Sequence, residues 1–360
     1  MRKSRSIASY VMVCLAFCLI AGVLFIWVFD ISLQIISPIR SGEEPLQPTK
    51  LKIGLVMNSL LEDRWQKERN VFVSRAQKLG AEVYVKTGLN DGKMQINHIK
   101  YLISKNVDVL VIIPQNGQLL KDVINEAKQK GIKVICYNSY VKDANIDLYI
   151  GADNEELGKL QAENICKTSG KGEYIVLNGS AGDTSAQEVN LGLKQELNTP
   201  QKKDLVNVVL EEWVQDFDPI YAERYVRNSL IEHENIKGII APNDICAGQV
   251  VKLLTERHLD AKVNVIGADA ENLACKRILN GTQLGTMYIP FDDMAKTAAE
   301  WAVAFAEEKR GGAKELSKSK QSLYIEKKIN TGNGELPALI FPVKYIDRNN
   351  VSEVYPMLNN

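Results

Sequence analysis

The sequence predicts an α/β protein in which two doubly wound, parallel-sheet lobes follow an N-terminal transmembrane helix. From residue 52 onward, apolar runs of strand length alternate with helical patterns. The runs are almost continuously apolar, which is typical of parallel strands that helices cover on both faces. About ten such runs occur in two series, and this is more than one compact core accommodates. We therefore expect two lobes.

The first element is an apolar segment, residues 7–29, that contains no charged residue and follows Arg2, Lys3 and Arg5. At about 1.5 Å per residue a helix of this length spans roughly 35 Å, enough to cross a membrane. The segment is longer than the apolar part of a cleavable signal peptide and lacks a small-residue cleavage site. Basic residues before the segment favour a cytoplasmic N-terminus. We expect a single-pass anchor in the plasma membrane, with residues 1–6 cytoplasmic and the main domain extracytoplasmic.

A linker is expected next, over residues 30–50, because segment 37–50 contains three prolines and charges of both signs. Strands are then expected over two series of ranges: 52–58, 82–87, 107–114, 133–138 and 148–152, followed by 172–178, 206–213, 237–243, 263–269 and 283–290. Helical spacing joins them; Trp65, Phe72, Ala76 and Leu79, for example, share one helix face before Gly80.

Composition and motifs exclude several classes of function. The formal net charge is zero and no basic block occurs, so we expect no nucleic-acid partner. The three histidines are far apart and the six cysteines form no CxxC, so we expect neither a metal site nor structural disulfides. The sequence also lacks GxSxG, a GxGxxG after the first strand and a phosphate-binding loop. We expect no cofactor and no enzymatic activity.

Polar and aromatic residues follow the expected strands. In a parallel sheet the carboxyl ends of the strands form the ligand-binding edge. Amides, carboxylates and aromatic rings together are typical of sugar recognition, because they bind hydroxyls and stack on the apolar face of a sugar ring. The residues at these ends are Asn58, Arg64, Trp65, Asn116, Asn138, Ser139, Asp183, Trp213, Phe217, Asn243 and Asp269.

Each of these residues also has a purely structural interpretation. Asn243 or Asp269 alone would more often cap a helix than bind a ligand. Asp183 lies in a Gly- and Ser-containing loop and is typical of a turn. Trp65 is as compatible with the core as with a site. Their recurrence at the same end of successive strands favours a binding site.

Five stretches resemble the periplasmic D-xylose-binding proteins, a branch of the type I sugar-binding proteins. They are KIGLVMN with DRWQKER, VDVLVIIPQNGQ, GIKVICYN, APNDICAG and VIGADAENLACKRILNGTQ. The resemblance covers residues 51 to 350 approximately. It implies a type I periplasmic binding protein fold in which residues 51–151 plus 290–330 form the N-terminal lobe, and residues 152–289 plus 338–360 form the C-terminal lobe.

The resemblance also implies roles for single residues. Arg64 would hydrogen-bond the sugar, and Trp65 and Phe217 would stack on its two faces. Asp183, Asn243 and Asp269 would bind hydroxyl groups from the second lobe. The chain departs from the family's pattern at four positions, where Asn138-Ser139 replace Asp-Arg, Ser185 replaces Asn and Ile289 replaces Lys. Two cationic donors are therefore absent.

These observations predict a membrane-anchored protein that binds a monosaccharide, with a pentose such as xylose as the first choice. The predicted role is the sugar-sensing subunit of a two-component histidine kinase. The alternative is the substrate-binding component of a sugar ABC transporter, with a permease as the membrane partner. A protein-interaction module that has lost sugar binding is the alternative of another class.

Overall fold

The first lobe is built on a mixed sheet of seven strands. A computed structural model describes residues 50–60, 62–312, 323–332 and 334–355. The strand order is β11-β12-β5-β4-β3-β1-β2, and only β11 runs antiparallel to its neighbour. The strands are β1 (Leu51–Met57), β2 (Ala81–Thr87), β3 (Val109–Ile112), β4 (Lys133–Tyr137), β5 (Leu148–Ala152), β11 (Ile325–Asn330) and β12 (Glu335–Phe341).

The second lobe contains a parallel sheet of four strands in the order β7-β6-β8-β9. These are β6 (Gly172–Asn178), β7 (Val206–Trp213), β8 (Ile236–Ile240) and β9 (Asn264–Ile266). A separate antiparallel pair joins β10 (Thr286–Tyr288) to β13 (Lys344–Ile346). Each of the ten apolar runs expected from the sequence overlaps one of the strands β1 to β10. The parallel pairing that we expected is confirmed for β1–β5 and β6–β9, whereas β10 pairs antiparallel with β13.

The sheet strands are apolar along their whole length because both of their faces are buried. In β6, Tyr174 and Val176 pack into one core cluster, while Ile175 and Leu177 pack into another on the opposite face. Strand β3 divides its residues between two clusters in the same alternating way. Successive side chains of a strand point to opposite faces, so a sheet between two helical layers needs apolar residues at every position.

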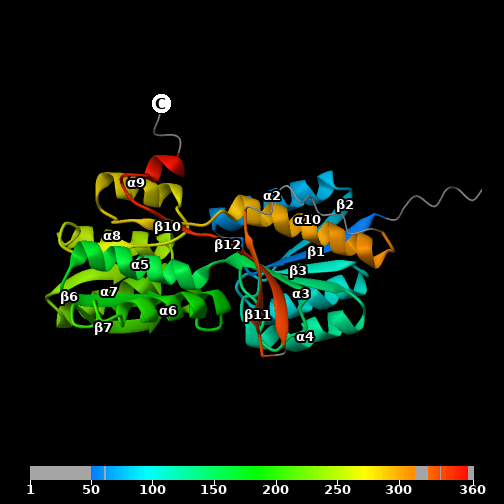
Figure 1. Ribbon diagram of the computed structural model, residues 1–360, viewed down its shortest axis with the longest axis horizontal. Helices are drawn as coiled ribbons and strands as arrows, with labels where there is room; N and C mark the ends of the chain where they lie inside the picture. Colours follow the sequence, from blue (N-terminus) through cyan, green and yellow to red (C-terminus); the bar gives the residue numbers. More distant parts are fainter. Residues whose placement is uncertain (1–49, 61, 313–322, 333, 356–360) are drawn as a thin grey trace, which may run out of the picture. The chain divides into compact units, whose positions relative to one another are not determined.

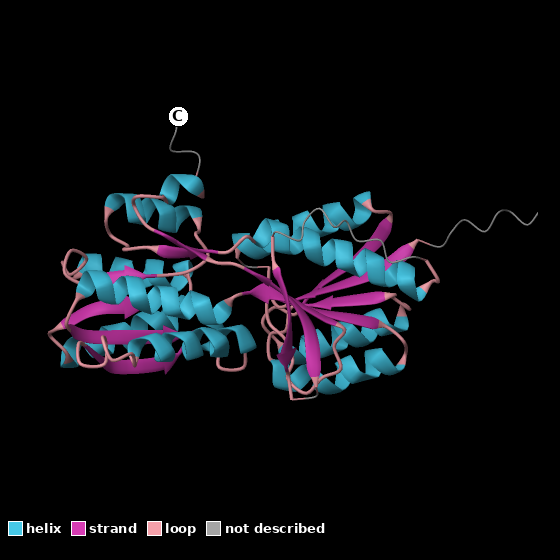
Figure 2. Cartoon of the chain, viewed as in Figure 1, coloured by secondary structure: helices cyan, strands magenta, loops and turns pink. Residues whose placement is uncertain are grey.

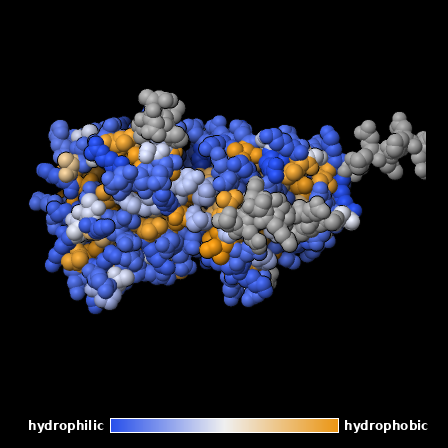
Figure 3. All heavy atoms as spheres, turned by 45° about the horizontal axis from the view of Figure 1, so that its top comes forward, coloured by the Kyte–Doolittle hydropathy of each residue, from blue (hydrophilic) through white to orange (hydrophobic). Residues whose placement is uncertain are grey.

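Helices supply these layers (Figures 1 and 2). On the first sheet α2 (Asp63–Lys78) and α10 (Phe291–Lys309) cover one face, and α3 (Gly92–Ser104) and α4 (Gly117–Gln129) cover the other. On the second sheet α5 (Asn154–Ser169) and α6 (Thr184–Leu197) lie opposite α7 (Pro219–Glu232) and α8 (Asp244–Glu256). The remaining elements are α9 (Asn272–Asn280) and the short helices η1 (Gln215–Phe217) and η3 (Val351–Glu353). On the face drawn in Figure 3 the surface is mainly hydrophilic, with scattered apolar patches.

Three segments connect the lobes: β5 to α5, β10 to α10, and β12 to β13. The predicted lobe boundary differs from the structure at the third segment. We expected residues 338–360 in the second lobe, but β12 pairs with β5 of the first sheet as far as Phe341. The chain crosses between Phe341 and Lys344 instead. Residues 336–341 are the last apolar strand of the first sheet, so their burial keeps them in that lobe.

The predicted location in the plasma membrane requires correction. Within the ranges that the structure describes, no helix is both long enough and apolar enough to cross a membrane. The expected span at residues 7–29, the residues 1–6 before it and nearly all of the linker 30–50 lie outside the described residues.

Candidate functional site

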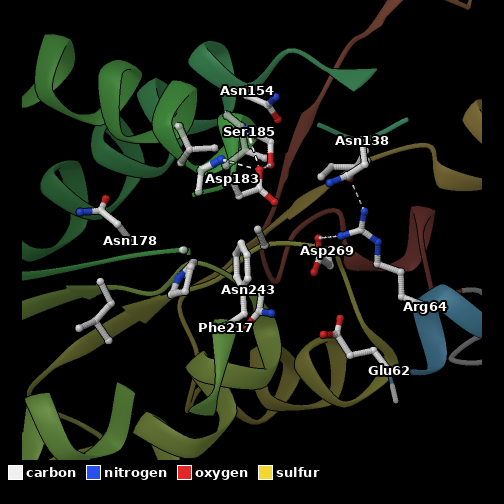
Figure 4. A pocket seen from close by; sticks show the side chains of 18 of the residues that line it. Glu62, Arg64, Asn138, Asn154, Asn178, Asp183, Ser185, Phe217, Asn243 and Asp269 are labelled. Carbon is white, nitrogen blue, oxygen red and sulfur yellow. Dashed lines mark hydrogen bonds and ion pairs between the residues drawn. The ribbon is translucent and has the colours of Figure 1, made fainter. Parts of the chain in front are cut away.

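A pocket lies where the carboxyl ends of strands from both sheets meet (Figure 4). It contains about 860 Å³ of space free of protein atoms, counting the part that opens to solvent. The first lobe contributes the start of α2 and the loops after β2 and β4. The second lobe contributes the loops after β6, β7, β8 and β9, and both are joined by residues of the crossing segments.

Arg64 is the central first-lobe residue of this pocket. Its Nε donates to Glu68 Oε1 at 2.7 Å, one Nη donates to Asp269 Oδ1 at 3.1 Å, and the other donates to Asn138 Oδ1 at 2.6 Å. The bond to Asp269 reaches across to the second lobe. Burial lowers the pKa of Arg64, but the carboxylates of Asp269 and Glu68 outweigh burial and raise it above its usual value. Arg64 is therefore a fixed cation.

Glu68 and Tyr137, which do not line the pocket, fix the position of Arg64. Glu68 is on the same helix, one turn after Arg64, and its other carboxylate oxygen accepts a hydrogen bond from the Tyr137 hydroxyl. Both side chains are buried. Burial raises the pKa of Glu68, while Arg64 and Tyr137 lower it. This buried group fixes the guanidinium orientation.

Trp65 has a double role in the packing. Its side chain is only 5% exposed and belongs to the first-lobe core, yet it also lines the pocket. The guanidinium carbon of Arg64 lies 4.2 Å from the centroid of the Trp65 ring and 3.5 Å from that of Phe291. The tryptophan is thus partly covered by Arg64, and its stacking on a ligand stays a prediction.

Asp183 and Ser185 form the second-lobe wall opposite Arg64 (Figure 4). Asp183 is the N-cap of α6, and its Oδ1 accepts from the backbone N–H of Ser185 at 2.7 Å and of Ala186 at 3.4 Å. The same oxygen accepts from the Ser185 hydroxyl at 2.6 Å. Burial raises the pKa of Asp183, and these hydrogen bonds oppose the rise.

Asn243 is held in the same way at the start of α8. Its Oδ1 accepts from the backbone N–H of Cys246 at 2.9 Å, so it caps the helix while its amide lines the pocket. The cap and ligand interpretations of Asp183 and Asn243 are therefore compatible. Each residue points one polar atom at its helix and leaves another for the pocket.

Phe217 enters the pocket on a strained turn. Asp216 and Phe217 have φ angles of 53° and 54°, a left-handed conformation that is costly for residues other than glycine. The Phe217 ring packs directly against Gly179, where an added Cβ would come within 2.3 Å of a ring carbon. Asp216 accepts a hydrogen bond from Gln115 of the first lobe at 2.9 Å. These two contacts hold the strained turn, and with it the ring, in the pocket.

The pocket brings together all six residues that the sequence placed first: Arg64, Trp65, Asp183, Phe217, Asn243 and Asp269. Four of the second set, Asn58, Asn138, Ser185 and Ile289, also line it. Their roles toward a ligand stay predictions.

Three predicted positions lie outside the lining. Asn116 is the N-cap of α4 and accepts from the backbone N–H of Gln118 at 3.0 Å. Ser139 lies in the loop after β4 and is only 1% exposed. Trp213 ends the edge strand β7 and lies before the turn that carries Phe217. Strand-end position alone did not separate these residues from the lining ones.

Several lining residues were not predicted: Glu62, Asn90, Asn154, Gln161, Asn178 and Asp216. Asn154 follows the end of β5, so the strand-end rule applied to the crossing strand would have found it. Glu62 stands two residues before Arg64 and could have been found by its position. Gln161 lies in the middle of α5, and nothing in the sequence marks it. Among the described residues, no group of three or more His, Cys, Asp and Glu side chains could hold a metal ion.

Comparison with known proteins decides the family. Residues 53–310 match the periplasmic binding protein domain. The chain belongs to the periplasmic binding protein family. It is 36% identical to the D-xylose-binding periplasmic protein of Haemophilus influenzae over 304 residues, which covers 84% of this chain and 88% of the relative. It is also 36% identical to the D-xylose-binding periplasmic protein of Escherichia coli over 305 residues, covering 84% and 89%.

Solved structures of sugar-binding proteins share the fold. A carbohydrate transporter solute binding protein from Chloroflexus aurantiacus, in complex with D-glucose, has a TM-score of 0.74 at 20% identity, covering 84% of this chain and 94% of that one. The fructose binding periplasmic domain of a hybrid two component system has a TM-score of 0.73 at 20% identity, covering 86% and 94%. The predicted resemblance and the type I periplasmic binding protein fold are confirmed. The two curated relatives are named periplasmic proteins, which also stands against the predicted location in the plasma membrane.

Proposed function

We propose that this protein binds a monosaccharide, with a pentose such as D-xylose as the first candidate, in the pocket between its two lobes. One observation carries the proposal. Arg64 of the first lobe and Asp183, Phe217 and Asn243 of the second line a single pocket. The two relatives at 36% identity, named for D-xylose binding, support this ligand class.

The polar atoms left over in the pocket suit a ring of hydroxyl groups. A guanidinium has five N–H donors, and Arg64 gives three of them to protein oxygens, which leaves two for a ligand. Asn243 caps α8 through its oxygen, and its amide N–H groups have no hydrogen-bond acceptor among the described residues. Asp183 uses only Oδ1 in its cap, so Oδ2 is an acceptor for a hydroxyl. A sugar hydroxyl both donates and accepts, and it can therefore pair with each of these atoms.

An apolar contact completes the site. The Phe217 ring and the side chain of Ile289 both line the pocket. An aromatic face packs well against the C–H bonds of a pyranose ring. Ile289 contributes contact area but no hydrogen bond.

Ligand binding is expected to favour closure of the lobes. Bonds already cross between them, from Arg64 to Asp269 and from Gln115 to Asp216. Micromolar affinity corresponds to roughly −8 kcal/mol, which for a pentose is about −0.8 kcal/mol per heavy atom. So small a ligand reaches such a value only if it is nearly enclosed. A ligand that touches both lobes stabilises the closed arrangement.

We further propose that a partner protein recognises the closed, ligand-bound form. The preferred partner is a sensor histidine kinase, for which this protein would be the sugar-sensing subunit. The domain of a hybrid two component system with the same fold makes the role structurally feasible. Transport is the second candidate, because solved relatives of this fold include ABC transporter solute binding proteins. Deleting the gene should abolish sugar-dependent transcription but preserve sugar uptake if the role is sensing, and should abolish uptake if it is transport.

Isothermal titration calorimetry against D-xylose, other pentoses and hexoses tests the binding itself. We expect at least one monosaccharide to bind at one site per chain. Failure of every sugar, with a folded protein, would contradict the proposal and would favour an interaction module without a sugar ligand.

A further inference from the structure

Acidic residues outnumber basic residues in the pocket lining. Four carboxylate residues line it, and Arg64 is the only Lys, Arg or His among the described lining residues; the four are Glu62, Asp183, Asp216 and Asp269. Arg64 forms ion pairs with Asp269 and with Glu68 behind it. Its positive charge is therefore already balanced before the remaining carboxylates are counted.

Glu62 is the lining carboxylate that the protein itself does not use. It occupies the N-cap position of α2, where a side chain usually accepts from the helix N–H groups, but it forms no such bond. Within the described part of the chain it forms no side-chain hydrogen bond or ion pair, in contrast to Asp183, Asp216 and Asp269. Its carboxylate points into the pocket rather than back onto its helix (Figure 4).

Gln161 adds a second acceptor without a partner. The side chain is 1% exposed and lines the pocket. Its Nε2 donates to the carbonyl oxygens of Ala241 at 3.2 Å and Gly267 at 2.9 Å, and this fixes the orientation of the amide. Its Oε1 is buried and has no hydrogen-bond partner in the described structure.

We propose that the preferred ligand of this pocket is a polyhydroxylated amine, an amino or imino sugar, whose ammonium group binds the Glu62 carboxylate. The inference rests on the proposed function and narrows it, since the hydroxyl groups would bind Arg64, Asp183 and Asn243 as described. An ammonium group offers only donors and a positive charge, which match the excess of acceptors and of negative charge in the pocket. A neutral sugar matches the acceptors but leaves the charge uncompensated.

The surroundings of Glu62 strengthen this assignment. The titratable groups that act on it electrostatically come from three elements: Arg64 and Glu68 from α2, Asp269 and Glu271 from the loop before α9, and Cys246 from α8. Burial, with help from Asp269 and Glu68 and against the effect of Arg64, raises the pKa of Glu62 to about 7. A bound ammonium would stabilise the ionised carboxylate and lower this pKa again.

Matched ligand pairs test the proposal by titration calorimetry on the whole protein. The first pair is D-xylose and 1,5-dideoxy-1,5-imino-D-xylitol, the ring-nitrogen analogue of xylopyranose, and the second is D-glucose and D-glucosamine. In at least one pair we expect the charged ligand to bind about tenfold more tightly, as a charge-assisted hydrogen bond provides. Glu62→Gln should remove this preference. Asp63→Asn, which changes the same charge at the exposed neighbouring residue, should preserve it.

A pH series gives a second readout. The ammonium ligand binds the ionised carboxylate, and below pH 7 the ionised fraction of Glu62 grows with rising pH. Affinity for the imino sugar should therefore rise between pH 5 and pH 6.5, where the ring amine stays protonated, by up to about tenfold per pH unit. Glu62→Gln should flatten this dependence.

The outcomes separate this inference from the proposed function. Binding of a neutral sugar as tight as or tighter than that of its charged partner in both pairs would overturn the inference and leave sugar binding intact. A charge preference that survives in Glu62→Gln would also overturn the assignment to Glu62. If no ligand of either pair binds, and no other monosaccharide does, both proposals fail together.

Discussion

The two lobes hold their pocket residues by different physical means. In the first lobe Arg64 is fixed by ion pairs and hydrogen bonds among side chains, with Glu68 and Tyr137 behind it. In the second lobe Asp183 and Asn243 are fixed by the N–H groups of the helices that they cap. Loss of Arg64 leaves buried carboxylates without a counter-charge, whereas loss of a cap leaves backbone donors without an acceptor. Substitution of Arg64 in the first lobe should therefore be more destabilising than substitution of Asp183 or Asn243 in the second.

The largest effect is expected for Arg64→Ala. The change removes two donors to the ligand and leaves Glu68 and Asp269 as unpaired buried charges, a situation that costs about 2–5 kcal/mol. Sugar affinity should fall by at least about a hundredfold in calorimetry. Arg69→Ala on the same helix is the control, because the Arg69 guanidinium hydrogen-bonds only the neighbouring Asn70 among the bonds described. Equal affinity losses in the two variants would contradict a direct role of Arg64 in binding the ligand.

Phe217→Ala should have the next largest effect, a loss of about 1–3 kcal/mol in sugar binding. The ring lines the pocket, and its strained turn is held in place by packing against Gly179. Trp213→Phe is the matched comparison, since Trp213 is a half-buried aromatic on the same segment that lies outside the lining. Trp213→Phe should bind as the parent does. If Trp213→Phe loses more sugar affinity than Phe217→Ala, the aromatic contact of the second lobe has been assigned to the wrong residue.

The smallest effects are expected for two asparagines that cap helices, Asn243 and Asn116. Asn243→Ala and Asn116→Ala should each lower the free energy of unfolding by about 1 kcal/mol, because both asparagines cap a helix. Only Asn243→Ala should also weaken sugar binding, by roughly fivefold, since only Asn243 lines the pocket. Denaturant unfolding and calorimetry on both variants measure the two quantities independently. An equal affinity loss for Asn116→Ala would place that side chain at the ligand.

The sheets could be predicted well from the sequence because a parallel strand that is buried on both faces has a continuous apolar run. The same rule fails where that condition is absent. Strand β11 has the sequence IEKKIN and is mostly exposed at the sheet edge, so no apolar run marks it. Strand β13 is only three residues long. Because neither strand could be recognised in the sequence, the third connection between the lobes was predicted several residues too early.

Prediction of the site was limited for a different reason. Asn116 and Asn243 share the same local signal, an asparagine that caps a helix after a strand, yet only one faces the pocket. The difference arises from how the lobes are arranged, which no local pattern encodes. Gln161 reaches the pocket from the middle of α5 because that helix begins at a crossing segment. Residues at strand ends were accessible to sequence reasoning, and residues brought in by tertiary packing were not.

The central claim is that one ligand contacts side chains of both lobes at once. A crystal structure of the protein with its best-binding sugar tests this claim most directly. We expect ligand oxygens within about 3.2 Å of Arg64 on one side and of Asp183 or Asn243 on the other, with Phe217 against the ring. A sugar bound to only one lobe, or outside this pocket, would contradict the account.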